Sequence, residues 1–246
     1  MVQLVAHRGY AARFPENTRL ALAAAIAEGA RYLEVDVQLS RDGVPVLFHD
    51  ANGARLCGVP LVIGEESYET LTGLSVFAPA RFGERFRGTP LARLQELADL
   101  LAEHPHVSAF VEIKPDTLQY FDAVYVVAAI CEVLSQVSAQ VVLISFALEL
   151  LEVVRNRGLR LGVIAQRYAE LTRPEVTALH PEYRFCDLTG LPEGTLAAAD
   201  VDLIVYEVPS VAVARGLQAR GLSWFETFAI GELLRELAVP GHGQPR

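Results

Sequence analysis

Two acidic side chains alternate with valines in the segment Glu34-Val35-Asp36-Val37, which has the pattern of a β-strand. Residues i and i+2 of a strand point to the same face, so Glu34 and Asp36 share one face and the valines take the other. A strand inside a parallel sheet is buried on both sides, and two unpaired buried carboxylates would be very costly. A divalent cation would neutralise them. The alternative is a half-exposed strand whose outer residues are polar.

A second segment, Phe110-Val111-Glu112-Ile113-Lys114, repeats this alternation with Glu112 and Lys114 on one face. A third carboxylate would complete a site for Mg²⁺ or Ca²⁺, because both ions prefer oxygen ligands and keep some waters. Lys114 would then place a positive charge beside a phosphate oxygen. The alternative is a Glu–Lys pair on the surface.

Two histidines lie at the ends of strand-like runs: His7, which is followed by Arg8, and His49. A histidine near its usual pKa of ~6.5 exchanges protons at neutral pH, so a pair can act as a general base and a general acid. Arg8 is suited to bidentate contact with a phosphodiester. The remaining histidines have no such setting and receive no role: His104, His106, His180 and His242.

Short β-like runs alternate with helical runs along the chain, as in βαβ units. The predicted strands are Leu4–His7, Tyr32–Leu39, Ala109–Ile113, Val141–Phe146, Arg160–Ile164, Arg184–Cys186, Asp202–Tyr206 and Leu222–Phe225. The predicted helices are Thr18–Glu28, Leu91–Glu103, Asp122–Val137, Leu148–Arg157, Pro174–Leu179, Ser210–Arg220 and Gly231–Leu237. This order predicts an α/β fold, a (β/α)₈ TIM barrel, with a doubly wound open sheet as the alternative. The first strand lacks the glycine-rich turn of a dinucleotide site.

The chain of 246 residues is predicted to form a single domain, 1–246. Segment 51–90 is irregular and rich in turn residues, and a connection of this length is usually functional or packed on its own. We therefore expect it to form a small inserted cap over the barrel mouth. The end of the chain, 239–246, is expected to be a flexible tail. In the first predicted helix, Asn17 is the expected N-terminal cap and Gly29 the left-handed stop.

Composition narrows the function classes. The chain is 52% hydrophobic and 21% charged, which is sufficient for a large core, and its formal charge of −9 argues against nucleic-acid binding. Its three cysteines are far apart and form no Cys-x-x-Cys pair, so we expect reduced thiols. No apolar run is expected to reach the ~18 residues of a membrane span, and the N-terminus has no signal-peptide pattern. We therefore expect a cytoplasmic protein without stable membrane insertion.

Several motifs, in this order and spacing, resemble the glycerophosphodiester phosphodiesterase family. They are His7-Arg8-Gly9, Pro15-Glu16-Asn17-Thr18, Glu34-Val35-Asp36-Val37, Asp42-Gly43-Val44-Pro45-Val46, His49-Asp50, Glu112-Ile113-Lys114 and Ser145-Phe146. The resemblance covers residues 4 to about 146. It implies a (β/α)₈ barrel with an inserted cap. It also implies one divalent metal ion, Mg²⁺ or Ca²⁺, bound by Glu34, Asp36 and Glu112.

The same resemblance implies an enzyme whose small-molecule substrate is a glycerophosphodiester. The products would be glycerol 3-phosphate and an alcohol. His7 and His49 would form the general acid–base pair, and Arg8 and Lys114 would hold the phosphate. The attacking group could be water or the neighbouring glycerol hydroxyl, which would form a cyclic phosphate.

The C-terminal part departs from the family, whose members often have a Trp-Thr-Val-Asn-like strand. The nearest segments here are Val205–Val208 and Phe225–Phe228. Tyr206 is a candidate for the aromatic contact with substrate, with an ordinary core tyrosine as the alternative. Three alternatives remain open. They are a lysophospholipase D that uses aromatics of segment 51–90 as an apolar lip, a metal-dependent barrel lyase or aldolase, and a catalytically silent binding domain.

Overall fold

The strands of this protein close into a barrel. The computed structural model describes residues 2–194 and 202–238. Eight parallel strands form the barrel: β1 (Gln3–Ala6), β2 (Tyr32–Leu39), β4 (Ser108–Ile113), β5 (Val141–Ser145), β6 (Leu161–Ala165), β7 (Tyr183–Asp187), β8 (Asp202–Tyr206) and β9 (Trp224–Thr227). The sheet closes because β1 pairs with both β9 and β2. The predicted (β/α)₈ barrel is therefore confirmed, and the open sheet is wrong.

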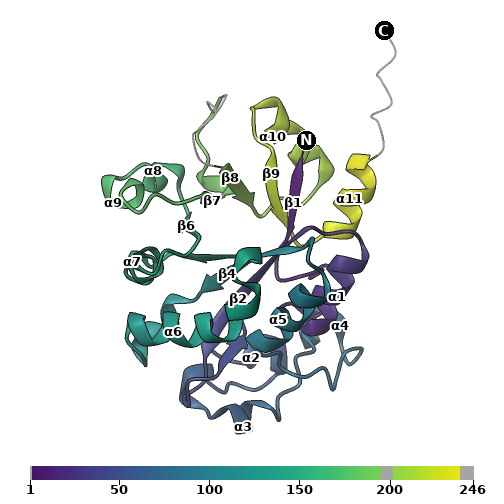
Figure 1. The fold of residues 1–246 in the computed structure, drawn as a ribbon. Coiled ribbons are helices and arrows are strands. Elements are labelled where there is room, and N and C mark those ends of the chain that lie inside the picture. Colours follow the sequence, from purple (N-terminus) through teal and green to yellow (C-terminus); the bar gives the residue numbers. More distant parts are fainter. Residues whose placement is uncertain (1, 195–201, 239–246) are drawn as a thin grey trace.

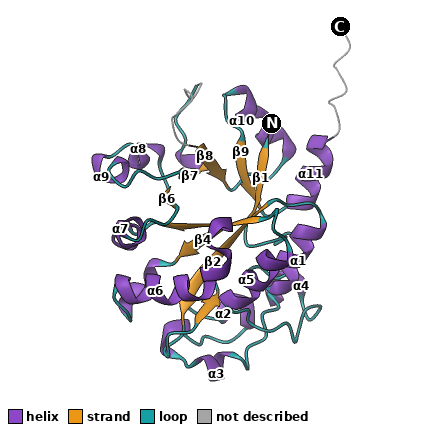
Figure 2. Cartoon of the chain, viewed as in Figure 1, coloured by secondary structure: helices purple, strands orange, loops and turns teal. Residues whose placement is uncertain are grey.

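Helices lie around the outside of the strands (Figures 1 and 2). They are α1 (Arg19–Ala27), α5 (Leu94–Glu103), α6 (Ala123–Leu134), α7 (Leu148–Asn156), α8 (Tyr168–Leu171), α9 (Pro174–Thr177), α10 (Val211–Ala219) and α11 (Ile230–Ala238). Two short helices, α8 and α9, stand where the sequence predicts only one. The strand-like run before His49 forms a short strand, β3 (Pro45–Leu47), which pairs antiparallel with β2.

Alternation along the strands divides the core into two layers. Val35 and Val37 of β2 belong to the large cluster between the strands and the helices. Phe110 and Trp224 belong to a smaller cluster. Its side chains point to the other face of the strands, into the barrel interior. The acidic residues of β2 alternate with its valines, so they face the barrel interior as the sequence predicts.

The N-terminus of α1 is capped by Thr18, not by Asn17. The Thr18 hydroxyl accepts a hydrogen bond from the backbone N–H of Ala21 at 3.2 Å. Asn17 lies one residue earlier with a φ of 56°, and its side chain is used elsewhere, against Asp36. The predicted stop at Gly29 is confirmed by its φ of +98°, which favours glycine.

Segment 51–90 has a small core of its own. It contains the short helices α2 (Ala54–Cys57), α3 (Tyr68–Leu71) and α4 (Pro79–Phe82) and a 3₁₀ turn, η1 (Ile63–Glu65). Their apolar side chains pack with those of the preceding strand in one cluster: Val46, Phe48, Leu56, Cys57, Ile63, Leu71, Leu74, Val76, Ala78 and Leu91. The segment is thus packed on its own, which is one of the two roles expected of a long connection. Its role as a cap within one domain stays a prediction, and the expected tail, 239–246, lies outside the described residues.

One stretch, Ala123–Gln140, is long and apolar enough to cross a membrane by length and composition alone. It joins α6 to the 3₁₀ turn η3 (Ser135–Gln140), has 18 residues and a mean hydropathy of 1.4, and is 33% buried. The expectation that no run reaches this length is therefore wrong. In the barrel, Val126, Val127 and Ile130 of α6 are fully buried in the core.

Candidate active site

Six of the seven predicted site residues line one pocket of about 100 Å³. The residues of its wall are His7, Arg8, Glu34, His49, Glu112, Lys114, Ile144, Phe146, Ile164, Phe185, Tyr206 and Glu226. The seventh predicted residue, Asp36, is fully buried and contacts Arg8 and Lys114. His7 and Arg8 directly follow β1 and Lys114 directly follows β4, at the strand ends where TIM barrels place their catalytic groups. Glu34, Asp36 and Glu112 lie within β2 and β4, and His49 follows β3.

Three carboxylates converge on one point of this pocket. One oxygen each of Glu34, Asp36 and Glu112 lies within 4.8 Å of the other two. Parallel pairing of β2 with β4 explains the proximity, because Asp36 and Glu112 are direct Cα partners in the register. Each of the three carboxylates has a buried oxygen without a hydrogen-bond partner.

The charges of these carboxylates are only partly compensated. Burial, together with the charge of Asp36, raises the pKa of Glu112 to about 7 and that of Glu34 well above its usual range. Burial would also raise the pKa of Asp36, but Arg8 and Lys114 outweigh it and lower that pKa. Buried carboxylate oxygens without a hydrogen-bond partner fit a hard divalent cation. The donor set therefore suits the predicted metal ion.

Arg8 is held in place by acidic groups on several sides. Its Nε lies 3.0 Å from Asp36 Oδ2, its Nη1 donates to Glu16 Oε1 at 2.7 Å, and its backbone N–H donates to Glu34 at 3.1 Å. Its φ is 55°, and the next residue, Gly9, has a φ of +79° with the backbone of α1 only 2.7 Å from where a Cβ would lie. A glycine is needed there, so the motif sets the backbone that aims Arg8 into the pocket.

Lys114 contacts two of the three carboxylates. Its Nζ forms an ion pair with Glu112 Oε1 at 2.8 Å and lies 3.4 Å from Asp36 Oδ1. Burial would lower the lysine pKa, but the charges of Asp36 and Glu112 outweigh it and raise that pKa. Lys114 therefore stays cationic and can attract a phosphate oxygen.

The ring of His7 is fixed on two sides. Its Nδ1 lies 2.6 Å from Glu207 Oε2, and its ring stacks on Phe228 with centroids 4.5 Å apart. With Nδ1–H donating to Glu207, the lone pair of Nε2 faces Glu34, whose Oε2 is 3.7 Å away. Burial lowers the His7 pKa, and Glu207 only partly offsets that effect. His7 is therefore neutral at neutral pH and can accept a proton at Nε2.

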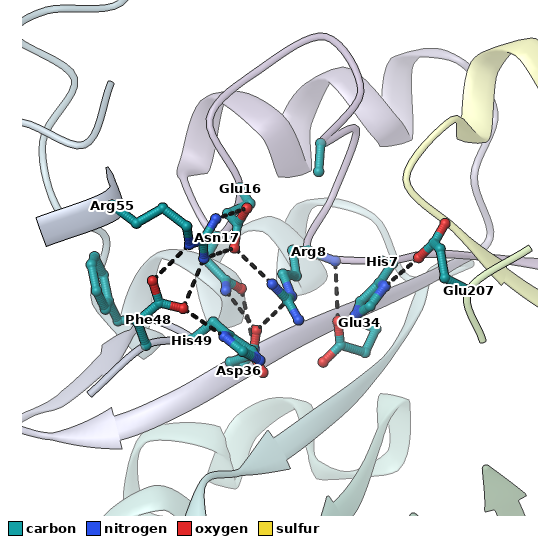
Figure 3. A network of polar contacts seen from close by, with 12 residues as sticks. His7, Arg8, Glu16, Asn17, Glu34, Asp36, Phe48, His49, Arg55 and Glu207 are labelled. Carbon is teal, nitrogen blue, oxygen red and sulfur yellow. Dashed lines mark hydrogen bonds and ion pairs between the residues drawn. The ribbon is translucent and has the colours of Figure 1, made fainter. Parts of the chain in front are cut away.

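His49 is joined to Arg8 through a chain of charged contacts (Figure 3). His49 Nδ1 lies 2.8 Å from Asp50 Oδ1, and Arg55 donates to both oxygens of Asp50 at 2.7 and 2.9 Å. Arg55 also donates to both oxygens of Glu16, at 2.9 and 2.8 Å, and Glu16 in turn accepts from Arg8. One network thus positions the two sides of the pocket.

Two residues at the site, Glu207 and Glu226, were given no role from the sequence. Both lie in the segments that depart from the family. The sequence did hold a signal for Glu226. It lies two residues after Trp224 in a buried strand, so both side chains point to the same face of the sheet. Glu207 follows the end of β8, where no periodic pattern applies. Tyr206 lines the pocket, and its hydroxyl donates to the Ala165 carbonyl at 3.0 Å.

Comparisons by sequence show which proteins this chain resembles. The profile of the glycerophosphoryl diester phosphodiesterase family matches residues 7–223. A glycerophosphodiester phosphodiesterase of Bacillus altitudinis is 29% identical over 120 residues, 49% of this chain and 48% of that protein. A human lysophospholipase D is 36% identical over 118 residues, 46% of this chain and 36% of that protein. The chain thus aligns with about half the length, or less, of these curated relatives.

Solved structures share the fold. An Oleispira antarctica phosphodiesterase, solved with the product sn-glycerol-3-phosphate, superposes with a TM-score of 0.85 at 21% identity over 96% of this chain and 97% of that one. A Silicibacter pomeroyi protein described as a glycerophosphoryl diester phosphodiesterase superposes with a TM-score of 0.81 at 22% identity, over 97% and 93%. Because the family profile matches most of its length, the chain belongs to the glycerophosphoryl diester phosphodiesterase family.

Proposed function

We propose that this protein hydrolyses glycerophosphodiesters to glycerol 3-phosphate and an alcohol, using a divalent cation bound by Glu34, Asp36 and Glu112. The observation that carries the proposal is the convergence of three buried carboxylates beside two histidines and, among the described residues that line the pocket, only two cationic side chains, Arg8 and Lys114. The cation would supply Lewis-acid stabilisation of charge on a phosphate oxygen. Membership of the family supports a phosphodiesterase over a lyase or aldolase.

The protein's own groups would divide the remaining work. Arg8 and Lys114 attract the phosphodiester oxygens and stabilise the charge that builds up on them in the transition state. His7 accepts a proton at Nε2 from the attacking hydroxyl. His49 donates a proton to the leaving alcohol, and Asp50 at its Nδ1 provides a counter-charge for the protonated ring. The attacking hydroxyl belongs to water or to the neighbouring carbon of the glycerol, and in the second case water then opens the cyclic phosphate to glycerol 3-phosphate.

Removal of divalent metal tests the proposal directly. We expect the full chain to release glycerol 3-phosphate from glycerophosphocholine in Mg²⁺ or Ca²⁺, and to lose at least ~100-fold in rate with EDTA, because a metal Lewis acid contributes several kcal/mol. Release is measured with a coupled glycerol 3-phosphate assay, and returning each cation in excess should restore it. Full activity in EDTA would contradict the metal site, and no release under any condition would support a silent binding domain.

A lysophospholipase D is the second candidate, because a human relative carries that name. Segment 51–90 brings aromatic side chains together, with Phe82 and Phe86 5.0 Å apart between ring centroids, but none of the residues that line the pocket comes from that segment. Glycerophosphocholine is the substrate that needs no apolar lip. A higher kcat/KM for lysophosphatidylcholine than for glycerophosphocholine would favour the lysophospholipase.

Glu207 is expected to act as a positioning residue for His7. Replacing Glu207 by glutamine should lower kcat by roughly 10-fold, as for other groups that orient a catalytic side chain. The carboxylate raises the His7 pKa, so its loss should lower that pKa further and move the acidic limb of the kcat/KM profile to lower pH. An unchanged pH profile would mean that Glu207 does not act through His7. Glu152→Gln, at an exposed site on α7, is the control.

A further inference from the structure

A fourth carboxylate, Glu226, lines the pocket from β9, the strand that closes the barrel against β1. It lies on β9 as the Cα partner of Val5 in β1, two residues before His7. Its side chain lines the pocket, the residue is only 3% exposed, and its buried Oε1 has no hydrogen-bond partner. Within residues 2–194 and 202–238, no lysine or arginine forms an ion pair with it. An uncompensated carboxylate at this depth is costly, and a bound cation would compensate its charge.

The groups around Glu226 have the composition of a metal site. One ligand atom each from His7, Glu34 and Glu226 lies within 4.8 Å of the other two. This set is separate from that of Glu34, Asp36 and Glu112, with which it shares only Glu34. Glu34 has two oxygens available for this, and its Oε1 has no hydrogen-bond partner.

The orientation of His7 supports the same conclusion. Its Nδ1 is used by Glu207 at 2.6 Å, which leaves the Nε2 lone pair facing Glu34. A histidine whose other ring nitrogen donates to a carboxylate is the usual arrangement of a metal-binding imidazole. Imidazole suits Zn²⁺, whereas a set of carboxylates alone suits Mg²⁺ or Ca²⁺. The two neighbouring sets therefore prefer different ions.

We propose that His7 Nε2, Glu34 and Glu226 form a second cation site that binds Zn²⁺ and thereby inhibits the enzyme. This inference rests on the proposed function, because inhibition requires His7 to be the base. An ion on Nε2 uses the lone pair that would accept the proton, so His7 cannot do both. Zn²⁺ at this site blocks turnover while the ion on Glu34, Asp36 and Glu112 stays bound.

Zn²⁺ binding to the full chain, measured by calorimetric titration, tests the site without reference to activity. We expect the metal-free wild type to bind two ions, Glu226→Gln to bind one, and Glu112→Gln to bind one. In excess Mg²⁺, Glu226→Gln should need at least ~10-fold more Zn²⁺ than wild type to halve its own zinc-free rate, as when an oxygen ligand is lost. Glu152→Gln should behave as wild type in both measurements.

The results that would contradict the second site differ from those that would contradict the proposed function. Equal numbers of bound Zn²⁺ ions in wild type and Glu226→Gln, or unchanged inhibition in Glu226→Gln, would overturn the second site and leave the proposed function intact. Turnover that is indifferent to EDTA, with no ion bound, would instead reject the metal in the proposed function and the second site with it. If Glu226→Gln does not melt cooperatively, Glu226→Leu provides the same comparison, because it also lacks a ligand oxygen.

Discussion

Replacing Glu112 by glutamine is expected to lower kcat/KM by at least ~100-fold while leaving the metal-free protein as stable as wild type or more stable. Glutamine keeps the shape of the side chain and removes one ligand charge. In the absence of metal that charge is a cost, because Glu112 is buried beside Asp36 and burial raises its pKa to about 7. Turnover with glycerophosphocholine and the melting temperature of the metal-free protein give the two measurements.

The stability difference should depend on pH in a defined direction. The pKa of Glu112 in the folded protein is about 7 against 4.5 for the ordinary group, so folding favours its protonated form. That stabilising contribution is complete below pH 4.5 and is lost as pH rises through 7. The gain in melting temperature of Glu112→Gln over wild type should therefore grow across this window, and a divalent cation should reduce it.

Two results would contradict this account of Glu112. Equal destabilisation of Glu112→Gln at every pH, with activity lost in proportion to the folded fraction, would assign Glu112 a purely structural role. Retention of wild-type kcat/KM would remove it from the metal site. The control is Glu152→Gln, because Glu152 is an exposed glutamate and its replacement should alter neither measurement.

Replacing either histidine of the pocket by alanine is expected to cost at least ~100-fold in kcat, the usual contribution of one acid–base group. His7→Ala removes the proton acceptor whose Nε2 faces the metal site, and His49→Ala removes the donor held by Asp50. The carboxylates Glu34, Asp36 and Glu112 remain, so Mg²⁺ or Ca²⁺ should still bind with an affinity close to that of wild type. Single-turnover rates and calorimetric titration with Mg²⁺ separate these two quantities.

An exposed histidine outside the pocket provides the comparison for this pair. His106→Ala changes a side chain between α5 and β4 and should leave kcat unchanged. Wild-type rates in both His7→Ala and His49→Ala would reject the acid–base assignment. Loss of Mg²⁺ binding in either variant would show instead that the imidazole contributes to the first cation site.

A chain of ion pairs and hydrogen bonds connects Arg8 on one side of the pocket with His49 on the other. His49 is reached from Arg8 only through Glu16, Arg55 and Asp50 within the contacts described above (Figure 3). Arg55 belongs to α2, so segment 51–90 contributes to the site by holding Glu16 and Asp50 rather than by lining the pocket. An inserted segment with its own core gives this bidentate arginine a rigid support.

Much of the site was readable in the sequence because strand alternation is a local property. The alternation of acids with valines in β2 places Glu34 and Asp36 on one face whatever the rest of the fold does. The alternating strands and helices also predict the barrel, and β2 and β8 have the predicted bounds. The pairing that brings Glu112 beside Asp36 follows from parallel neighbours in such a barrel.

Other features depended on contacts between residues distant in the chain. Asn17 and Thr18 can both cap a helix, and only the hydrogen bonds between Asn17 and Asp36 decide that Thr18 is the cap. Glu207 and Glu226 reach His7 because the barrel closes between β1 and β9, whose paired residues, such as Gln3 and Trp224, are more than 200 positions apart in sequence. Local pattern thus determined which faces are acidic, while barrel closure decided which acids meet, because register between distant strands is a property of the whole fold.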